Sequence, residues 1–218
     1  MKRAFAVIMV LLGFAASANA QGIQITEWMY SGNGCEFVEF TNMSTSAIDM
    51  TDWSYSDSDA APFDLMFGSI FGVVNAGESV ILTDIDASTF RTQWGLAASV
   101  KVYGPNSNSN LGRSDAINIY DASGSLVDSL TYDDQPGKGP RTQCKSCTMP
   151  SSDLGLTSAS LSWTLASVGD AYGSWASTAS DLGNPGTYYG APVPEPASLL
   201  AILTGLTGIC GFTSRRRK

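Results

Sequence analysis

The stretch Ile23-Gln24-Ile25-Thr26-Glu27-Trp28 alternates apolar and polar residues with a period of two, which is the pattern of a β-strand. Ser31-Gly32-Asn33-Gly34 follows and is typical of a turn. Cys35-Glu36-Phe37-Val38-Glu39-Phe40 then resumes the strand pattern, with Val38 and Phe40 on one face. These residues predict two neighbouring strands at the start of an all-β domain.

The same pattern of short strands and frequent turns continues to about residue 134. Residues 87–95 predict one short helix, because Phe90 and Trp94 are four residues apart and lie on one side of it. Trp53 is a candidate for a large core residue. Further strands are expected at residues 48–55, 69–74, 79–82, 99–103, 116–120 and 125–132, with two edge strands near 161–164 and 172–175. Short strands at this density predict a β-sandwich.

Several motifs occur in an order that resembles a lamin-tail domain. Glu36-Phe37-Val38-Glu39-Phe40-Thr41-Asn42 comes first, ahead of Asp49-Met50-Thr51-Asp52-Trp53. The others are Ala76-Gly77-Glu78-Ser79-Val80, Leu111-Gly112-Arg113-Ser114-Asp115, Ile119-Tyr120-Asp121 through Gly124, and Val127-Asp128-Ser129. The resemblance implies an immunoglobulin-like sandwich within residues 21–134 and a binding or tethering role, and it transfers no site residues.

The region beyond the sandwich motifs is expected to complete the same domain. Asp181-Leu182-Gly183-Asn184-Pro185-Gly186 resembles the closing segment of bacterial lamin-tail proteins. Residues 135–186 are therefore interpreted as a cysteine-containing loop and closing strands, and residues 187–193 as a linker.

The N-terminus has the features of a secretory signal peptide. Lys2-Arg3 precede an apolar run from Ala4 to Ala16, and Ala18 and Ala20 form an Ala-x-Ala cleavage site. Residues 1–20 are therefore predicted to be removed, so that the mature chain begins at Gln21.

The C-terminus, residues 194–218, contains a second targeting element. Pro194-Glu195-Pro196 is followed by a mostly apolar run at 197–212 and by the basic residues Arg215, Arg216, Arg217 and Lys218. A helix of that length with a cationic end suits a membrane edge better than a buried helix of a soluble domain. The stretch resembles a PEP-CTERM sorting signal, which implies a bacterial protein held briefly in the inner membrane. An exosortase-type protease and the secretion machinery would then deliver it to the cell surface or matrix.

The charge between the two targeting ends is strongly negative. Six of the twelve Lys and Arg residues lie in those ends, whereas Glu195 is the one acidic residue of twenty that does, so residues 21–212 have a net charge of −14. Such a chain repels nucleic acid and anionic lipid headgroups. This acidity favours the binding of divalent cations, or it simply keeps an exported protein soluble.

Three cysteines remain outside the tail, Cys35, Cys144 and Cys147, and they predict a structural disulfide in an oxidising compartment. Cys144 pairs with Cys147, or either of them pairs with Cys35. A redox Cys-x-x-Cys needs a helix N-terminus, which the surrounding glycines and prolines do not provide. A single pair of thiols is too few for a zinc site.

No catalytic constellation is present. The chain has no histidine, which excludes Ser-His-Asp and Cys-His nucleophile systems. Glu27, Glu36 and Glu39 are on neighbouring strands and include a possible glycosidase pair, but exposed acidic positions are common in an acidic protein. Asp57, Asp59, Asp84 and Asp86 are weak calcium candidates and are more typical of solvated loops.

The sequence thus predicts a non-enzymatic, exported β-sandwich without cofactors that binds a surface protein or the extracellular polysaccharide. The alternative is a carbohydrate- or calcium-binding module of that polysaccharide.

Overall fold

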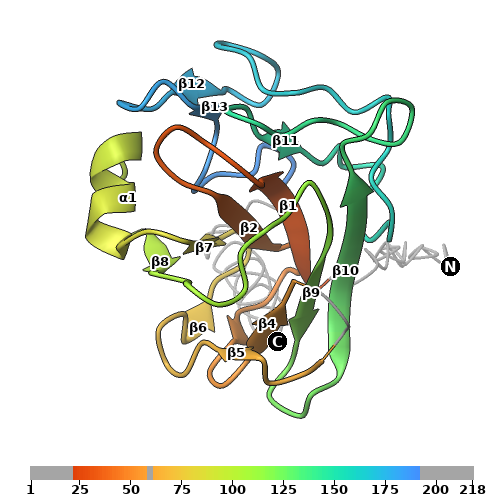
Figure 1. Cartoon of the computed structure of the whole chain (residues 1–218). Coiled ribbons are helices and arrows are strands. Elements are labelled where there is room, and N and C mark those ends of the chain that lie inside the picture. The colour runs from red at the N-terminus through yellow and green to blue at the C-terminus, as the bar shows by residue number, and fades with distance from the viewer. Residues whose placement is uncertain (1–21, 58–60, 192–218) are drawn as a thin grey trace, which may run out of the picture.

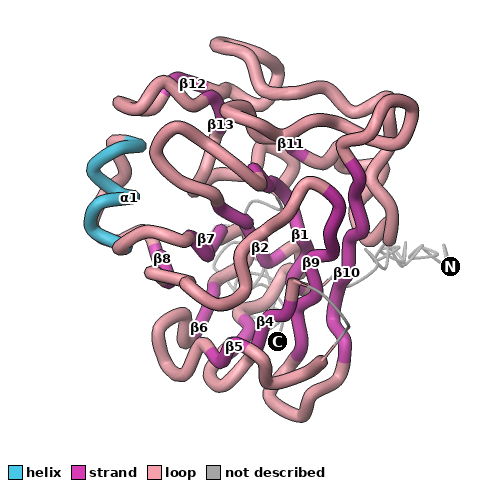
Figure 2. Tube along the Cα trace, in the orientation of Figure 1, coloured by secondary structure: helices cyan, strands magenta, loops and turns pink. Residues whose placement is uncertain are grey.

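The computed structural model describes residues 22–57 and 61–191. Its elements are almost all short strands joined by long loops (Figure 2). The predicted signal peptide, Asp59 and the whole sorting signal lie outside the described residues. Within them, no helix is long and apolar enough to cross a membrane.

Two sheets make up the body of the molecule (Figure 1). The first has the strand order β11-β1-β2-β7-β8, in which only β7 and β8 run parallel. The second has the order β10-β9-β4-β5 and is antiparallel throughout. The bounds in the first sheet are β1 Ile23–Met29, β2 Phe37–Asn42, β7 Ser79–Thr83, β8 Lys101–Tyr103 and β11 Cys147–Thr148. In the second they are β4 Ser54–Ser56, β5 Leu65–Met66, β9 Ser114–Tyr120 and β10 Leu126–Asp133.

The remaining elements are small. The pair β3 Ile48–Asp49 and β6 Val73–Val74 lies beside the main sheets, and β12 Trp175–Ala176 pairs with β13 Leu182–Gly183 near the end of the described chain. The helix α1 spans Ala87–Trp94. It confirms the predicted helix, and Phe90 and Trp94 are its two buried residues.

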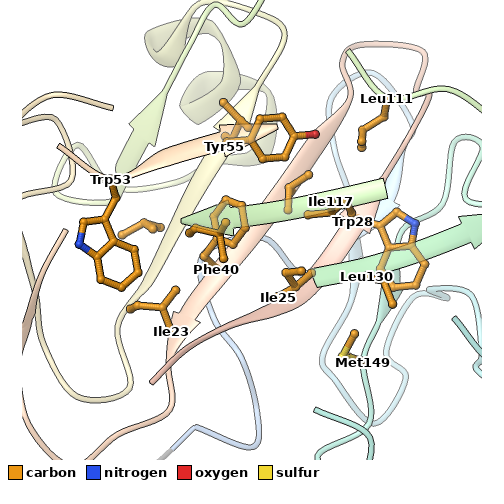
Figure 3. Close-up of a cluster of buried hydrophobic side chains, with 14 of the residues drawn as sticks. Ile23, Ile25, Trp28, Phe40, Trp53, Tyr55, Leu111, Ile117, Leu130 and Met149 are labelled. Carbon is orange, nitrogen blue, oxygen red and sulfur yellow. The ribbon is translucent and has the colours of Figure 1, made fainter. Parts of the chain in front are cut away.

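The main core lies between the two sheets. Ile23, Ile25 and Phe40 of the first sheet pack in one cluster with Ile117 and Leu130 of the second (Figure 3). Trp53 belongs to the same cluster, as the sequence predicts. The described chain is therefore mostly β, and its two layers of strands enclose this apolar core.

The region beyond residue 134 contributes to this core. Cys147, Met149 and Trp163 belong to the cluster, and the Trp163 ring meets Trp28 edge-on with 5.9 Å between ring centroids. The strand β11 also pairs directly with β1. Residues 147–163 are therefore part of the sandwich.

Several of the predicted strands are shorter in the structure or absent from it. Residues 48–55 do not form one strand, because Asp52 has φ 59° and the Asp49 carboxylate accepts hydrogen bonds from Thr51. This turn separates β3 from β4. In the expected edge strands at 161–164 and 172–175, only Trp175 lies in a strand, at the start of β12.

Candidate functional site

The outer face of the first sheet has an unexpected concentration of buried polar groups. A β-bulge between Ile25 and Glu27 shifts the register of β1, and Thr26 and Glu27 are both completely buried. Glu27 lies directly opposite Glu39 of β2. Glu39 is also completely buried. We call Glu27 and Glu39 the carboxylate pair.

The segment that covers this pair is residues 181–186, here called the closing segment. Glu27 Oε1 accepts a hydrogen bond from Asn184 N at 2.8 Å and another from the Ser146 hydroxyl. Glu39 Oε2 accepts one from Gly186 N at 2.6 Å. The two carboxyl groups thus fasten the backbone of the closing segment onto the sheet.

Hydroxyl groups complete the surroundings of Glu39. Thr26 Oγ1 lies 2.7 Å from Glu39 Oε1 and 2.8 Å from Thr41 Oγ1, which in turn lies 2.7 Å from Ser79 Oγ. Glycine is needed above Glu27, because a Cβ at Gly183 would lie 2.8 Å from Glu27 Oε1 and 2.9 Å from Ser146 Oγ. The closing segment therefore fits closely against the pair.

Burial changes the protonation of both groups. It raises the pKa of Glu27 to about 8, and the nearby charge of Glu39 acts in the same direction. Burial likewise raises the pKa of Glu39. Glu27 Oε2 is buried with no hydrogen-bond partner among the described atoms, a position that disfavours the ionised form.

A different polar site opens at one end of the sandwich, in a hollow of about 490 Å³. We call it the arginine hollow. Its lining comes from the loop after β1, the loop before β9 and the loop after β10. The side chains are Tyr30, Ser31, Glu36, Arg113, Arg141 and Gln143, with Leu111 and Gly112 between them.

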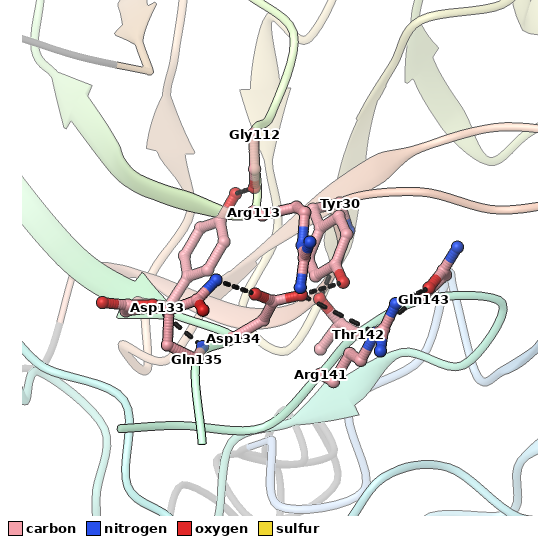
Figure 4. Close-up of polar contacts among 10 residues, drawn as sticks. Tyr30, Gly112, Arg113, Asp133, Asp134, Gln135, Arg141, Thr142 and Gln143 are labelled. Carbon is pink, nitrogen blue, oxygen red and sulfur yellow. Dashed lines mark hydrogen bonds and ion pairs between the residues drawn. The ribbon is translucent and has the colours of Figure 1, made fainter. Parts of the chain in front are cut away.

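The buried carboxylate of Asp134 contacts three of the side chains that line this hollow. Its Oδ2 accepts hydrogen bonds from Tyr30 Oη at 2.7 Å and Arg113 Nε at 2.8 Å, and it lies 3.7 Å from Arg141 Nε. Figure 4 shows the two arginines reaching Asp134 from separate segments. The Asp134 side chain has no exposed surface, whereas Arg113 is 58% and Arg141 57% exposed. The Arg113 guanidinium holds the pKa of Asp134 below its usual value, which keeps the carboxylate ionised.

Arg141 and Glu36 complete the lining. Gln143 Oε1 accepts hydrogen bonds from Arg141 Nε at 3.1 Å and Nη2 at 2.7 Å, which orients the guanidinium. Glu36 Oε1 accepts one from Leu111 N at 2.9 Å. Burial raises the pKa of Glu36 to about 8, assisted by the charges of Asp84, Asp57 and Asp115. At neutral pH the hollow therefore contains two cations, one carboxylate and one mostly neutral carboxyl group.

Comparison with known proteins assigns this architecture to a family. A model of the lamin tail domain family matches residues 16–134, which is more than half of the chain. The chain belongs to the lamin tail domain family. No curated protein sequence matches it. The mostly β structure with two facing sheets is consistent with the immunoglobulin-like fold that this family implies.

The family match ends one residue after β10. Arg113 and Asp134 of the arginine hollow therefore lie within the lamin tail domain, and Arg141 and Gln143 lie beyond it. The closing segment also lies beyond it, although it covers the sheet that the domain provides.

The glutamates are not the exposed strand positions that the sequence suggests. Glu27 and Glu39 are sealed beneath the closing segment, so neither reaches solvent or a substrate. Glu36 is partly exposed and belongs to the arginine hollow instead. The structure therefore does not assemble a glycosidase pair from Glu27 and Glu39.

The calcium candidates have separate structural roles. Asp86 caps α1 by accepting hydrogen bonds from Ser88 N and Thr89 N. Asp84 accepts one from Glu36 N at 2.9 Å. Asp57 is described, and its charge acts on Glu36. Among residues 22–57 and 61–191, no three His, Cys, Asp or Glu side chains gather as metal ligands.

The predicted disulfide is not formed, since Cys35, Cys144 and Cys147 are all free. Cys147 points into the main core, whereas Cys35 belongs to the separate cluster beside α1. Cys144 has φ 58° and its thiol lies 3.6 Å from Asn33 Oδ1. Burial raises the pKa of Cys35 and Cys147 to about 12, so both remain unreactive thiols.

Sequence reasoning missed the arginine hollow because Tyr30, Arg113, Asp134 and Arg141 are far apart in the chain. One signal was available. Lys138 and Arg141, two of the six cations among the described residues, follow Asp133-Asp134 within eight residues of the chain, and the structure pairs both with those acids. Such a concentration of cations around adjacent acids is unusual in a chain this acidic.

Proposed function

We propose that this lamin tail domain protein is a non-enzymatic binding module, exported and displayed at the cell surface or in its matrix. The observation that carries the choice of binding over catalysis is the burial of the carboxylate pair. A glycosidase needs two carboxyl groups that flank a substrate, and Glu27 and Glu39 accept hydrogen bonds from the protein's own backbone instead.

The targeting ends support the proposed location. Residues 1–20 have the order of a signal peptide, and residues 194–218 have the order of a PEP-CTERM sorting signal with a membrane helix at 197–212. In this proposal the tail helix holds the protein in the inner membrane until an exosortase-type protease cleaves near Pro194-Glu195-Pro196. The immunoglobulin-like sandwich is then released to the surface.

The arginine hollow is the proposed contact for another surface component. It is an open concave site of a size that binds small groups, and its charged side chains come from three loops that meet beside the buried Asp134 carboxylate. The partner is an extracellular polysaccharide or another surface protein. Nucleic acid does not fit, because the net charge of −14 repels a phosphate backbone.

Intact mass and location of the protein in its native cells test this proposal. We expect a surface or matrix form that begins at Gln21 and ends near Pro194. An inner-membrane form that retains Arg215–Lys218 would overturn the sorting proposal, and the sandwich would then be a permanently anchored domain.

A further inference from the structure

We propose that the arginine hollow binds the carboxylate group of an acidic glycan. The inference rests on the proposed function as a surface binding module and names the ligand class of its site. The two arginines of the hollow have unequal roles.

The Asp134 carboxylate has enough hydrogen-bond donors without Arg141. Asp134 already accepts hydrogen bonds from Tyr30, Arg113 and Gln135, at 2.7, 2.8 and 3.1 Å. Arg141 lies farther away, at 3.7 Å. Two guanidinium groups thus face one carboxylate, so Asp134 alone does not neutralise both.

The geometry of these groups suits a planar anion. More than half of each arginine side chain is exposed, and Gln143 holds Arg141 through two hydrogen bonds. A guanidinium group donates parallel hydrogen bonds to the two oxygens of a carboxylate. A guanidinium that is oriented in advance loses less conformational freedom on binding.

The rest of the lining suits sugar hydroxyl groups. Ser31 contributes a hydroxyl group, and Gln143 uses its carbonyl oxygen for Arg141, which leaves its amide NH₂ as a donor. Glu36 is mostly protonated at neutral pH, so its carboxyl group does not repel an incoming anion.

The overall charge of the chain selects against densely charged ligands. Residues 21–212 have a net charge of −14, so a chain of closely spaced phosphates is repelled as a whole. A glycan with one carboxylate per sugar ring has a lower charge density and places a single anionic group in the hollow.

Calorimetric titration of the full-length protein with uronate trisaccharides tests the proposal. The probes are trisaccharides of galacturonate, glucuronate and mannuronate, each with its fully methyl-esterified form, and inorganic phosphate and sulfate as separate arms. We expect at least one uronate trisaccharide to bind and its ester to bind at least tenfold more weakly. Binding should also weaken as salt increases.

Matched variants locate the site. Arg141→Gln should weaken uronate binding at least tenfold, and Arg113→Gln should do the same. Lys145→Gln removes an exposed cation that does not line the hollow, so it should change binding less than twofold. Arg141→Gln leaves the Arg113–Asp134 pair intact, which keeps the test valid even if Arg113→Gln unfolds.

The proposal is overturned if no uronate trisaccharide binds, if the esters bind equally well, or if Arg141→Gln binds as the wild type does. Binding of phosphate or sulfate alone also overturns it. A protein that is correctly sorted to the surface but fails these titrations retains the proposed function and loses the ligand class.

Discussion

The carboxylate pair and the arginine hollow are both polar sites, but they have opposite relations to solvent. Glu27 and Glu39 are completely buried and hold the closing segment. Arg113 and Arg141 rest on a buried carboxylate and remain more than half exposed. A polar residue on a strand therefore indicates a site only after the segments that fold over it are known.

The largest loss of stability should come from deleting all residues after 134, including the closing segment. A chain ending at residue 134 loses Cys147, Met149 and Trp163 from the core and exposes the carboxylate pair. We expect it to lack a cooperative unfolding transition, because a lost core tryptophan alone costs about 3–5 kcal/mol. Urea unfolding followed by near-ultraviolet circular dichroism, with residues 22–191 as control, measures this. Equal stability of the two chains would show that the lamin tail domain folds without its cover.

The next effect concerns Glu27 alone. Glu27→Ala leaves Asn184 N and the Ser146 hydroxyl without their acceptor and opens a cavity, so we expect a loss of about 3–5 kcal/mol in unfolding free energy. Glu27→Gln keeps the shape and the acceptor oxygen, and should cost less than about 1 kcal/mol at pH 7. Chemical denaturation of both variants measures the difference. Similar losses for the two would contradict the fastening role.

The dependence of the unfolding free energy on pH tests the role of Glu27 further. Burial raises the pKa of Glu27 from 4.5 to about 8, so between those values the unfolded chain releases a proton that the folded chain retains. The contribution of Glu27 to stability is therefore complete below pH 4.5 and decreases until about pH 8, by at most about 1.4 kcal/mol per pH unit. Glu39 and Asp170 are the charged groups that act on it in the same direction.

Glu27→Gln removes this contribution, so the variant should lose less stability than the wild type between pH 5 and pH 8. Unfolding free energies at half-unit pH steps measure the two slopes. Parallel slopes would mean that Glu27 is ionised in the folded protein.

The smallest effect on stability belongs to the arginine hollow. Arg141→Gln removes an exposed side chain 3.7 Å from Asp134, and exposed ion pairs contribute little. We expect no measurable change in the unfolding midpoint, together with the loss of uronate binding. A large fall in the midpoint would make Arg141 a structural residue like Glu27.

Local sequence patterns predicted those parts of the fold that depend on neighbours in the chain. The spacing of Phe90 and Trp94 predicted α1, and residues 116–132 predicted the β9–β10 hairpin. The break at Asp52 was missed, because a positive φ at a non-glycine residue leaves no periodic signal.

The two polar sites depend on contacts between distant segments. Glu27 meets Asn184 across 157 residues, and Tyr30 meets Asp134 across 104. Alternation in β1 therefore assigned Glu27 to solvent, because nothing within the strand reports the later cover. The disulfide expectation failed for a related reason, since Cys144 and Cys147 are near in sequence but only Cys147 enters the core.

Hydrogen–deuterium exchange on residues 22–191, with and without the uronate trisaccharide that binds, tests the contrast between the two sites most directly. We expect slow exchange of the Asn184 and Gly186 amides in both states, with ligand-dependent protection confined to residues 111–113 and 141–143. Rapid exchange at Asn184 and Gly186, or ligand protection at the closing segment without any at the arginine hollow, would contradict it.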